Sequence, residues 1–232
     1  MKVAIHQPCY MPYLGVFYKM WQCDKFVFLD DAQYSNGYVF DWNKIKAPSG
    51  ECRIKVPTEK KFGDALNVIR PKDELGWQEK HLKTIEMCYH KAPFFDDFYP
   101  VLKCIILDKY ESLAELNITV MSAIAEKFGI RPDFYFSSDM GITTMKEQRV
   151  IDICKKVGAT TYISGHGAEN YQKGTHFIKE GIKLAYTDYT EIEYRQQWQG
   201  FLPNMSAIDY IFNEGYDFDR VVWLVKRGGM AE

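Results

Sequence analysis

Residues 2–31, KVAIHQPCYMPYLGVFYKMWQCDKFVFLDD, decide the fold class of the chain. The run from Lys2 to Ile5 is short and apolar with β-branched side chains, which predicts a buried strand. Apolar side chains at three- and four-residue spacing predict a helix over residues 13–23, and KFVFLDD at 25–31 predicts a second strand. A strand, a helix and a strand this close together favour a right-handed parallel crossover. We therefore predict an α/β, Rossmann-like, mostly parallel twisted sheet.

Later segments predict the remaining elements of this fold. Pro48-Ser49-Gly50 is a turn between residues 38–47 and 51–57, which predicts a β-hairpin. Three successive amphipathic helices follow at 73–91, 93–110 and 113–129, the last with a capping box from Ser112 to Glu115. We expect a single domain over residues 1–232, with 73–129 as a helical insert or lid. Further strands are predicted at 133–138, 160–165 and 182–189, and further helices at 145–157 and 206–215.

Composition excludes several classes of protein. The 232 residues are 47% hydrophobic and carry a formal charge of −2, unlike the basic footprint of a nucleic-acid-binding protein. No stretch approaches the roughly 20 apolar residues of a membrane span, and the start MKVAIHQP lacks the apolar region of a signal peptide. The six cysteines include no CxxC pair, so neither a zinc site nor a disulfide framework is expected. We expect a cytoplasmic protein without a metal centre of this kind.

Polar clusters follow three of the predicted strands, and the carboxyl ends of parallel strands are where ligands bind in open α/β sheets. The clusters are His6-Gln7, Asp30-Asp31 with Gln33, and Ser164-Gly165-His166-Gly167. If the strands are neighbours, these groups meet at one edge, where the helix at 13–23 offers backbone N–H groups to an anion. The glycine-rich loop is a candidate phosphate cradle, although it lacks the Walker spacing. Alternatively, His6 bonds a nearby carbonyl, the aspartates cap a turn and the glycine loop is a flexible turn.

Other charged side chains are weaker candidates. Lys44 and Lys46 share a face of the predicted hairpin and are candidates for binding a diphosphate, or else are solvated cations. Arg149 on the helix at 145–157 is another candidate for a phosphate, and SSDMG at 137–141 is either a grip for a sugar or amine or a helix-entry turn. We interpret the remaining histidines as structural: His81, His90 and His176.

The opening motif resembles that of the WbqC-like family, which is encoded in bacterial O-antigen and surface-polysaccharide clusters. The matching positions are His6, Gln7, Pro8, Tyr10, Pro12, Gly15, Asp24, Asp30, Asp31 and Gln33, followed by Asn43, Lys46, residues 162–165, Tyr171 and residues 206–215. Two positions depart from the pattern, because Cys9 stands where members often have Asn and Trp42 where they often have Arg. The resemblance implies a role in making polysaccharide precursors, and a glycine-transferring activity has been suggested for the family.

The leading hypothesis is a transferase that attaches a small acyl or aminoacyl group, such as glycine, to a nucleotide-linked amino sugar. His6 would be the general base. Asp30 or Asp31 would orient His6, or hold a sugar hydroxyl or a Mg²⁺ ion. Substrate-binding roles are assigned to Gln7, Tyr10, Gln33, Asn43, Lys46, Ser164, Gly165, His166, Gly167 and Tyr171. The expected partners are small molecules (a sugar nucleotide and an amino acid or acyl donor), and a homodimer is a candidate assembly.

Two alternatives remain open. The start of the chain resembles, at the level of fold, the HIGH-type nucleotidyltransferases, which would predict Mg²⁺ dependence and release of diphosphate. Their paired histidines are absent here because Val16 follows Gly15. The other alternative is a non-catalytic subunit that binds a sugar nucleotide.

Overall fold

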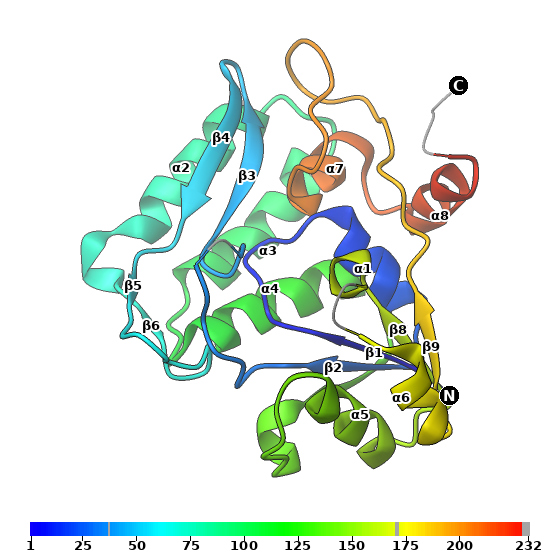
Figure 1. Ribbon diagram of the computed structural model, residues 1–232. Coiled ribbons are helices and arrows are strands. Elements are labelled where there is room, and N and C mark those ends of the chain that lie inside the picture. The colour runs from blue at the N-terminus through cyan, green and yellow to red at the C-terminus, as the bar shows by residue number, and fades with distance from the viewer. Residues whose placement is uncertain (37, 170–171, 229–232) are drawn as a thin grey trace.

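A five-stranded sheet forms the centre of the computed structural model, which describes residues 1–36, 38–169 and 172–228 (Figure 1). The strand order is β7-β2-β1-β8-β9, and every neighbouring pair is parallel. This arrangement confirms the predicted Rossmann-like α/β fold. The bounds are β1 Lys2–His6, β2 Lys25–Phe28, β7 Asp133–Phe136, β8 Thr161–Ser164 and β9 Lys183–Tyr186.

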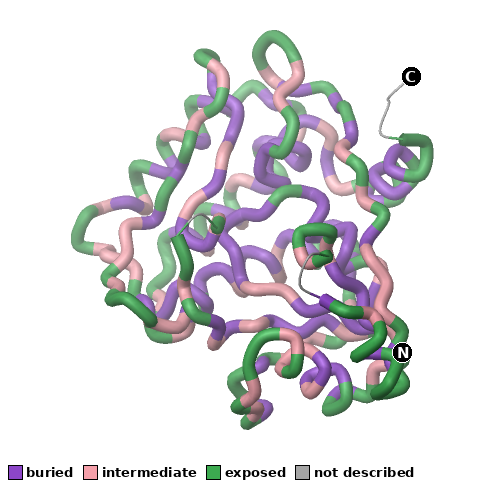
Figure 2. Tube along the Cα trace, viewed as in Figure 1, coloured by how far each residue is buried: buried purple, intermediate pink, exposed green. Residues whose placement is uncertain are grey.

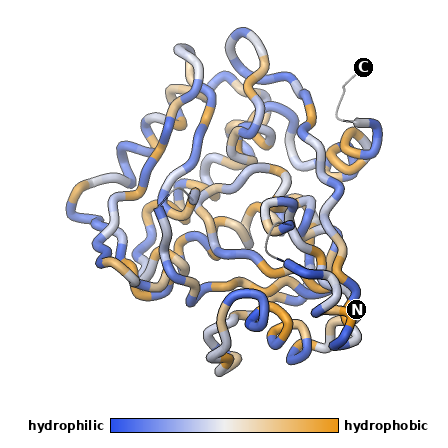
Figure 3. Tube along the Cα trace, in the orientation of Figure 1, coloured by the Kyte–Doolittle hydropathy of each residue, from blue (hydrophilic) through white to orange (hydrophobic). Residues whose placement is uncertain are grey.

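Helices cover both faces of the sheet. Val3 and Ile5 of β1 pack into a cluster with α5 and α6, whereas Ala4 packs into the larger cluster on the opposite face. This alternation along β1 reflects the two-residue period of a strand. The bounds of these helices are α5 Lys146–Lys156 and α6 Gly174–Lys179 on one face, and α1 Leu14–Trp21, α4 Leu113–Lys127, α7 Ala207–Glu214 and α8 Phe218–Lys226 on the other. Figures 2 and 3 show that buried and apolar segments coincide in the sheet and its covering helices.

The hairpin is present but starts later than predicted. Strands β3 (Trp42–Ala47) and β4 (Gly50–Lys55) are antiparallel about the turn at Pro48-Ser49. Residues 39–41 precede the hairpin as a bend, because the carbonyl of Phe40 accepts a hydrogen bond from Asn117 of α4 instead of pairing with β4. The small pair β5 (Thr58–Glu59) and β6 (Arg70–Pro71) was not predicted, since two residues show no periodicity.

The three helices predicted between 73 and 129 are α2 (Trp77–Tyr89), α3 (Phe95–Leu107) and α4. The first is shortened because Gly76 adopts a left-handed φ of 59° between a 3₁₀ turn and α2. The Oγ atom of Ser112 accepts a hydrogen bond from the Glu115 N–H at 3.1 Å, which confirms the predicted cap of α4. All three helices contribute to the larger hydrophobic cluster. Their role as an insert or lid stays a prediction.

No helix among the described residues is both long and apolar enough to cross a membrane.

Candidate functional site at the β1–β8 switch point

The chain leaves β1 and β8 toward opposite faces of the sheet. The segment after β1 leads to α1 on one face, and the segment after β8 leads to α6 on the other (Figure 1). The β1–β8 pairing ends at Ala4–Ile163, whereas β1–β2 pairing extends to His6–Phe28. In open α/β sheets, ligands bind beyond the carboxyl ends of strands at such a topological switch point. The polar clusters after β2, β1 and β8 therefore follow three adjacent strands, as the prediction required.

His6 ends β1 beside this point and is partly buried. Its Nδ1 lies 2.7 Å from the carbonyl oxygen of Gln7, which can only accept, so Nδ1 carries the proton and Nε2 keeps its lone pair. Burial, and secondarily the nearby charge of Lys19, lowers the pKa of His6 to about 3. The imidazole is therefore neutral near pH 7, with Nε2 available as an acceptor.

Lys19 is the part of this site that the sequence did not reveal. It is only 6% exposed, and its Nζ donates to the carbonyl oxygen of Ile5 at 3.0 Å. Burial lowers its pKa to about 8, an effect that the thiols of Cys23 and Cys9 oppose. A lysine on an amphipathic helix is ordinarily solvated, and only the packing of α1 on β1 turns this one inward.

Asp30 and Asp31 are tied to the neighbouring edge of the sheet. Ser138 donates to Asp30 from both its N–H (3.0 Å) and its hydroxyl (2.6 Å). Ser137 donates to both aspartates, and Arg149 of α5 donates to Asp31 at 2.6 Å. Nη2 of Arg149 and the two serines are therefore hydrogen-bonded to the aspartates, whereas the buried Nε of Arg149 has no partner in the described part of the chain. Nδ1 of His6 bonds Gln7, so neither carboxylate orients the ring through that atom.

The loop after β8 has the open backbone expected of a ligand site. Gly165 and Gly167 have no positive φ, and a Cβ added to either would meet nothing within 4 Å. Neither conformation nor packing thus requires glycine, and the backbone is left open to close approach. His166 stacks on Tyr186 with ring centroids 5.9 Å apart, and its hydrogen bond with Glu169 raises the pKa of His166. Ser164 is 1% exposed, and its carbonyl accepts from the Thr187 N–H at 2.9 Å.

The loop that follows His6 is held from within. Asn43 donates to the carbonyl oxygens of Tyr10 (3.0 Å) and Met11 (2.7 Å). Asn117 donates to that of Pro8 at 3.2 Å and also to that of Phe40. The amide of Asn43 is thus used to shape the loop.

The hydroxyl of Tyr10, another predicted binding residue, is also committed within the protein. Tyr10 is fully buried, and its hydroxyl bonds Nδ1 of His81 at 3.0 Å.

Residues 7–220 match the profile of the WbqC-like protein family. The chain belongs to this family. A Mycobacterium tuberculosis (strain ATCC 25618 / H37Rv) protein, "Uncharacterized protein Rv1507c", is 33% identical over 221 residues, which cover 92% of this chain and 94% of that protein. No solved structure gives a significant match.

A second buried polar cluster lies beneath the hairpin. The fully buried Asp209 of α7 accepts hydrogen bonds from Tyr89 (2.6 Å) and Tyr194 (2.8 Å). Lys46 is 1% exposed and donates from Nζ to the carbonyl of Gly200. Lys44 pairs instead with Glu51 at 2.7 Å. Lys46 therefore belongs to this cluster, and the two lysines do not form the shared diphosphate site that was considered for the hairpin.

The first turn of α1 differs from the expectation of an exposed anion site. Leu14, Gly15 and Val16 are buried, and the carbonyl of Pro12 accepts from the Ala207 N–H. A Cβ at Gly15 would lie 2.4 Å from the ring of Tyr13. The loop thus carries the helix start under neighbouring segments instead of presenting it to solvent.

The remaining predicted binding residues are Gln7, Gln33 and Tyr171. Gln7 is partly buried and contributes the carbonyl that accepts from His6. Gln33 is exposed and forms a β-bridge with Ala65, so its backbone lies against a different loop. Tyr171 lies outside the described residues.

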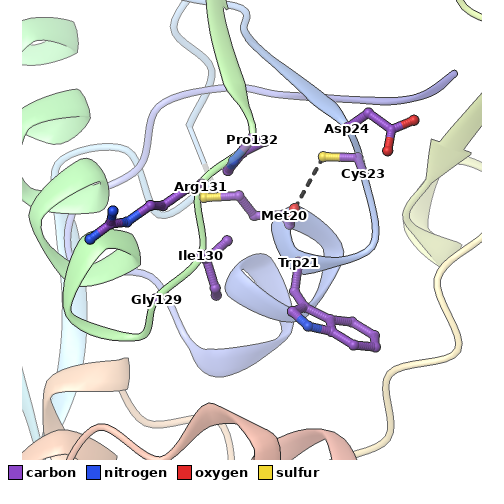
Figure 4. A pocket seen from close by; sticks show the side chains of 8 residues that line it. All are labelled: Met20, Trp21, Cys23, Asp24, Gly129, Ile130, Arg131 and Pro132. Atoms are coloured by element: carbon purple, nitrogen blue, oxygen red, sulfur yellow. Dashed lines mark hydrogen bonds between the residues drawn. The ribbon is translucent and has the colours of Figure 1, made fainter.

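One open pocket lies at the opposite edge of the sheet, where β2 and β7 begin (Figure 4). Its lining includes Asp24, whose carboxylate accepts from the Lys2 N–H at 2.7 Å, and Cys23, whose thiol donates to the carbonyl of Met20. Because this pocket is remote from the carboxyl ends of the strands, it does not form part of the switch-point site. Within the described ranges, no group of three or more His, Cys, Asp or Glu side chains is arranged to hold a metal ion.

Proposed function

We propose that this WbqC-like protein is a cytoplasmic transferase in the biosynthesis of bacterial surface-polysaccharide precursors, including O-antigen. It would attach a small acyl or aminoacyl group, with glycine as the leading candidate, to a nucleotide-linked amino sugar. The observation that carries the proposal is topological: His6, whose Nδ1 is bonded to Gln7 and whose Nε2 keeps its lone pair, and the open glycine loop Ser164–Gly167 follow the adjacent parallel strands β1 and β8 at their switch point.

The chemistry follows from the free Nε2 of His6. The amine of the sugar attacks the carbonyl carbon of an activated acyl donor, and the new C–N bond forms as the bond to the donor's leaving group breaks. The leaving group departs with the bonding electron pair, and the amine proton passes to Nε2. Because burial disfavours the imidazolium, an anionic group of the bound substrate would have to stabilise that charge.

The glycine loop supplies the second half of the proposed site. Backbone N–H groups of Ser164–Gly167 and the side chain of His166 would bind the phosphates of the nucleotide. Asp30 and Asp31 would act as positioning residues, because their bonds to the Ser137 and Arg149 side chains fix the adjacent loop. These bonds also occupy the carboxylates, so the donor set does not favour a Mg²⁺ site there.

Turnover by His6 variants tests the proposal. The purified protein is first screened by thermal shift against UDP-, dTDP- and CDP-sugars and free amino acids, and the hits are assayed for transfer by mass spectrometry. The His6→Ala variant should lose turnover while its melting temperature stays near that of the wild type. His90→Ala, at an exposed site, is the matched control and should keep full activity. Loss of folding in His6→Ala, or full turnover by it, would remove His6 from the chemistry.

The same screen separates the alternatives. Stabilisation by ATP with Mg²⁺ and release of diphosphate would favour a nucleotidyltransferase, and binding without turnover would favour a non-catalytic subunit. A homodimer stays a candidate assembly, to be measured by light scattering.

A further inference from the structure

Lys19 carries a buried charge without an acidic partner. No ion pair involving Lys19 is formed within 4.0 Å among residues 1–36, 38–169 and 172–228. Its Nζ can donate three hydrogen bonds, and the Ile5 carbonyl accepts one. A buried ammonium is unfavourable unless an anion compensates it. The titratable groups that face it are His6 and the thiols of Cys9 and Cys23. Burial lowers the pKa of His6 to about 3 and raises the pKa values of both thiols to about 12, so none of them supplies a negative charge near pH 7.

The position of the ammonium is set by the divergence of the two strands. The β1–β8 pairs end at Ala4–Ile163, and the carbonyl that Lys19 holds belongs to Ile5, the next residue of β1. Lys19 lies in the last turn of α1, yet its side chain reaches β1 instead of that helix's own terminal carbonyls. The ammonium is therefore bonded to the residue before His6, at the point where β1 and β8 diverge.

A second polar atom at this edge has no partner. The Oγ1 atom of Thr187 is buried and forms no hydrogen bond in the described part of the chain. Thr187 follows β9, and its N–H donates to the carbonyl of Ser164 at the end of β8. Buried hydroxyls are ordinarily bonded, so this hydroxyl at the carboxyl end of the sheet has the capacity to bond a group of a ligand.

We propose that Lys19 binds an oxyanion of the substrate, a carboxylate or a phosphate, at the switch point where β1 and β8 diverge. This inference rests on the transferase proposed above and names the group that anchors its substrate. The bound oxyanion would accept from the free N–H groups of Lys19, and its negative charge would stabilise the imidazolium that forms on His6. Lys19 is accordingly a binding residue, while His6 handles the proton.

Binding of defined anions by Lys19 variants tests the inference without requiring turnover. Calorimetric titrations use glycine, inorganic phosphate and UDP-N-acetylglucosamine, with glycinamide and uridine as analogues that lack the anionic group. Lys19→Met should weaken binding of the anchored probe roughly 10- to 100-fold, the effect of losing a charged hydrogen bond. Its melting temperature should be unchanged or higher, because an apolar side chain replaces an unpaired charge. Lys183→Met, at an exposed site where β9 begins, should bind like the wild type.

The pattern of losses identifies the anion. Weakened glycine binding alone assigns a carboxylate, and weakened phosphate and sugar-nucleotide binding assigns a phosphate. The inference is overturned if the wild type binds none of the three probes with an anionic group, if Lys19→Met binds them as tightly as the wild type, or if both Lys19→Met and Lys19→Gln fail to fold. Lys19-dependent binding without any transfer would leave the anion site standing and remove the transferase. Transfer that survives in Lys19→Met would support the transferase and exclude Lys19 as the anion-binding residue.

Discussion

The hydroxyl of Tyr89 in α2 donates a 2.6 Å hydrogen bond to Oδ1 of Asp209 in α7, 120 residues later in the chain. The same hydroxyl accepts from the backbone N–H of Lys46 in β3 at 2.9 Å. One phenol thus joins the hairpin, α2 and α7. Burial raises the pKa of Asp209, and the hydrogen bonds from Tyr89 and Tyr194 oppose that rise, so the carboxylate depends on its donors.

Tyr89→Phe should therefore lower the free energy of unfolding by about 1–3 kcal/mol, since it leaves two buried polar groups without their partner. Urea denaturation measures the change. Tyr99→Phe is the matched control, because its hydroxyl makes only a 3.4 Å bond to the Leu82 carbonyl. Equal losses of unfolding free energy in the two variants would show that the hydrogen bonds of Tyr89 do not stabilise the protein more than the long bond of Tyr99.

Arg149→Met should destabilise the protein by about 1–2 kcal/mol, because it leaves the partly buried Asp31 without its cation. Arg220→Met removes a more exposed guanidinium, and Glu214 keeps its hydrogen bond from the Arg195 N–H, so this substitution should cost less than about 0.5 kcal/mol. Thermal unfolding of both variants checks the order. A larger loss in Arg220→Met would contradict the assignment of Arg149 to the loop after β2.

The partly buried His6 predicts a specific dependence of stability on pH. Its pKa is about 3 in the folded protein and about 6.5 when exposed, so between these values the unfolded chain binds a proton that the native state does not. Stability should thus rise with pH from 3 to 6.5, by as much as about 1.4 kcal/mol per pH unit for this one group. His6→Gln should show a shallower slope in that window, measured by urea unfolding at several pH values. Parallel curves for the two proteins would place His6 in contact with solvent.

Gly15→Ala should destabilise the protein even though alanine favours a helix by about 1 kcal/mol over glycine. The new Cβ would lie 2.4 Å from the ring of Tyr13 and 2.8 Å from that of Tyr189, which predicts a net loss of about 1–2 kcal/mol. Gly174→Ala at the start of α6 has open space and should be neutral or stabilising. Thermal unfolding of both variants decides, and stabilisation by Gly15→Ala would contradict the packing described here.

The sheet was predictable because its signals are local. Short apolar runs bounded by polar residues located the strands, and the strand–helix–strand spacing of residues 2–31 indicated parallel pairing. Side-chain direction was not predictable in the same way. Tyr10 was expected to contact a substrate, but it is buried and its hydroxyl is bonded to His81. His81 lies 71 residues further along the chain, so no local pattern marks this contact.

The position of the candidate site could be predicted from the sequence, but not all of the side chains that form it. The order of the strands brings the polar clusters after β2, β1 and β8 to one edge, as expected from the pattern. Lys19 was not predicted as a site residue, because a lysine is normally solvent-exposed and only the packing of α1 against β1 buries this one. Lys46 was predicted to be a free cation, but its Nζ donates to the backbone carbonyl of Gly200. No pattern of side chains in the sequence indicates such a partner.

The two asparagines that clamp the loop after β1 have a consequence for folding. Asn43 donates to the carbonyl of Tyr10, which precedes it by 33 residues. Asn117 donates to the carbonyl of Pro8, which precedes it by 109 residues. The motif at the start of the chain is therefore shaped by segments that are synthesised much later. We expect its loop to become ordered late in folding, after α4 has docked, so that a nascent chain lacking α4 has the residues of the site without its geometry.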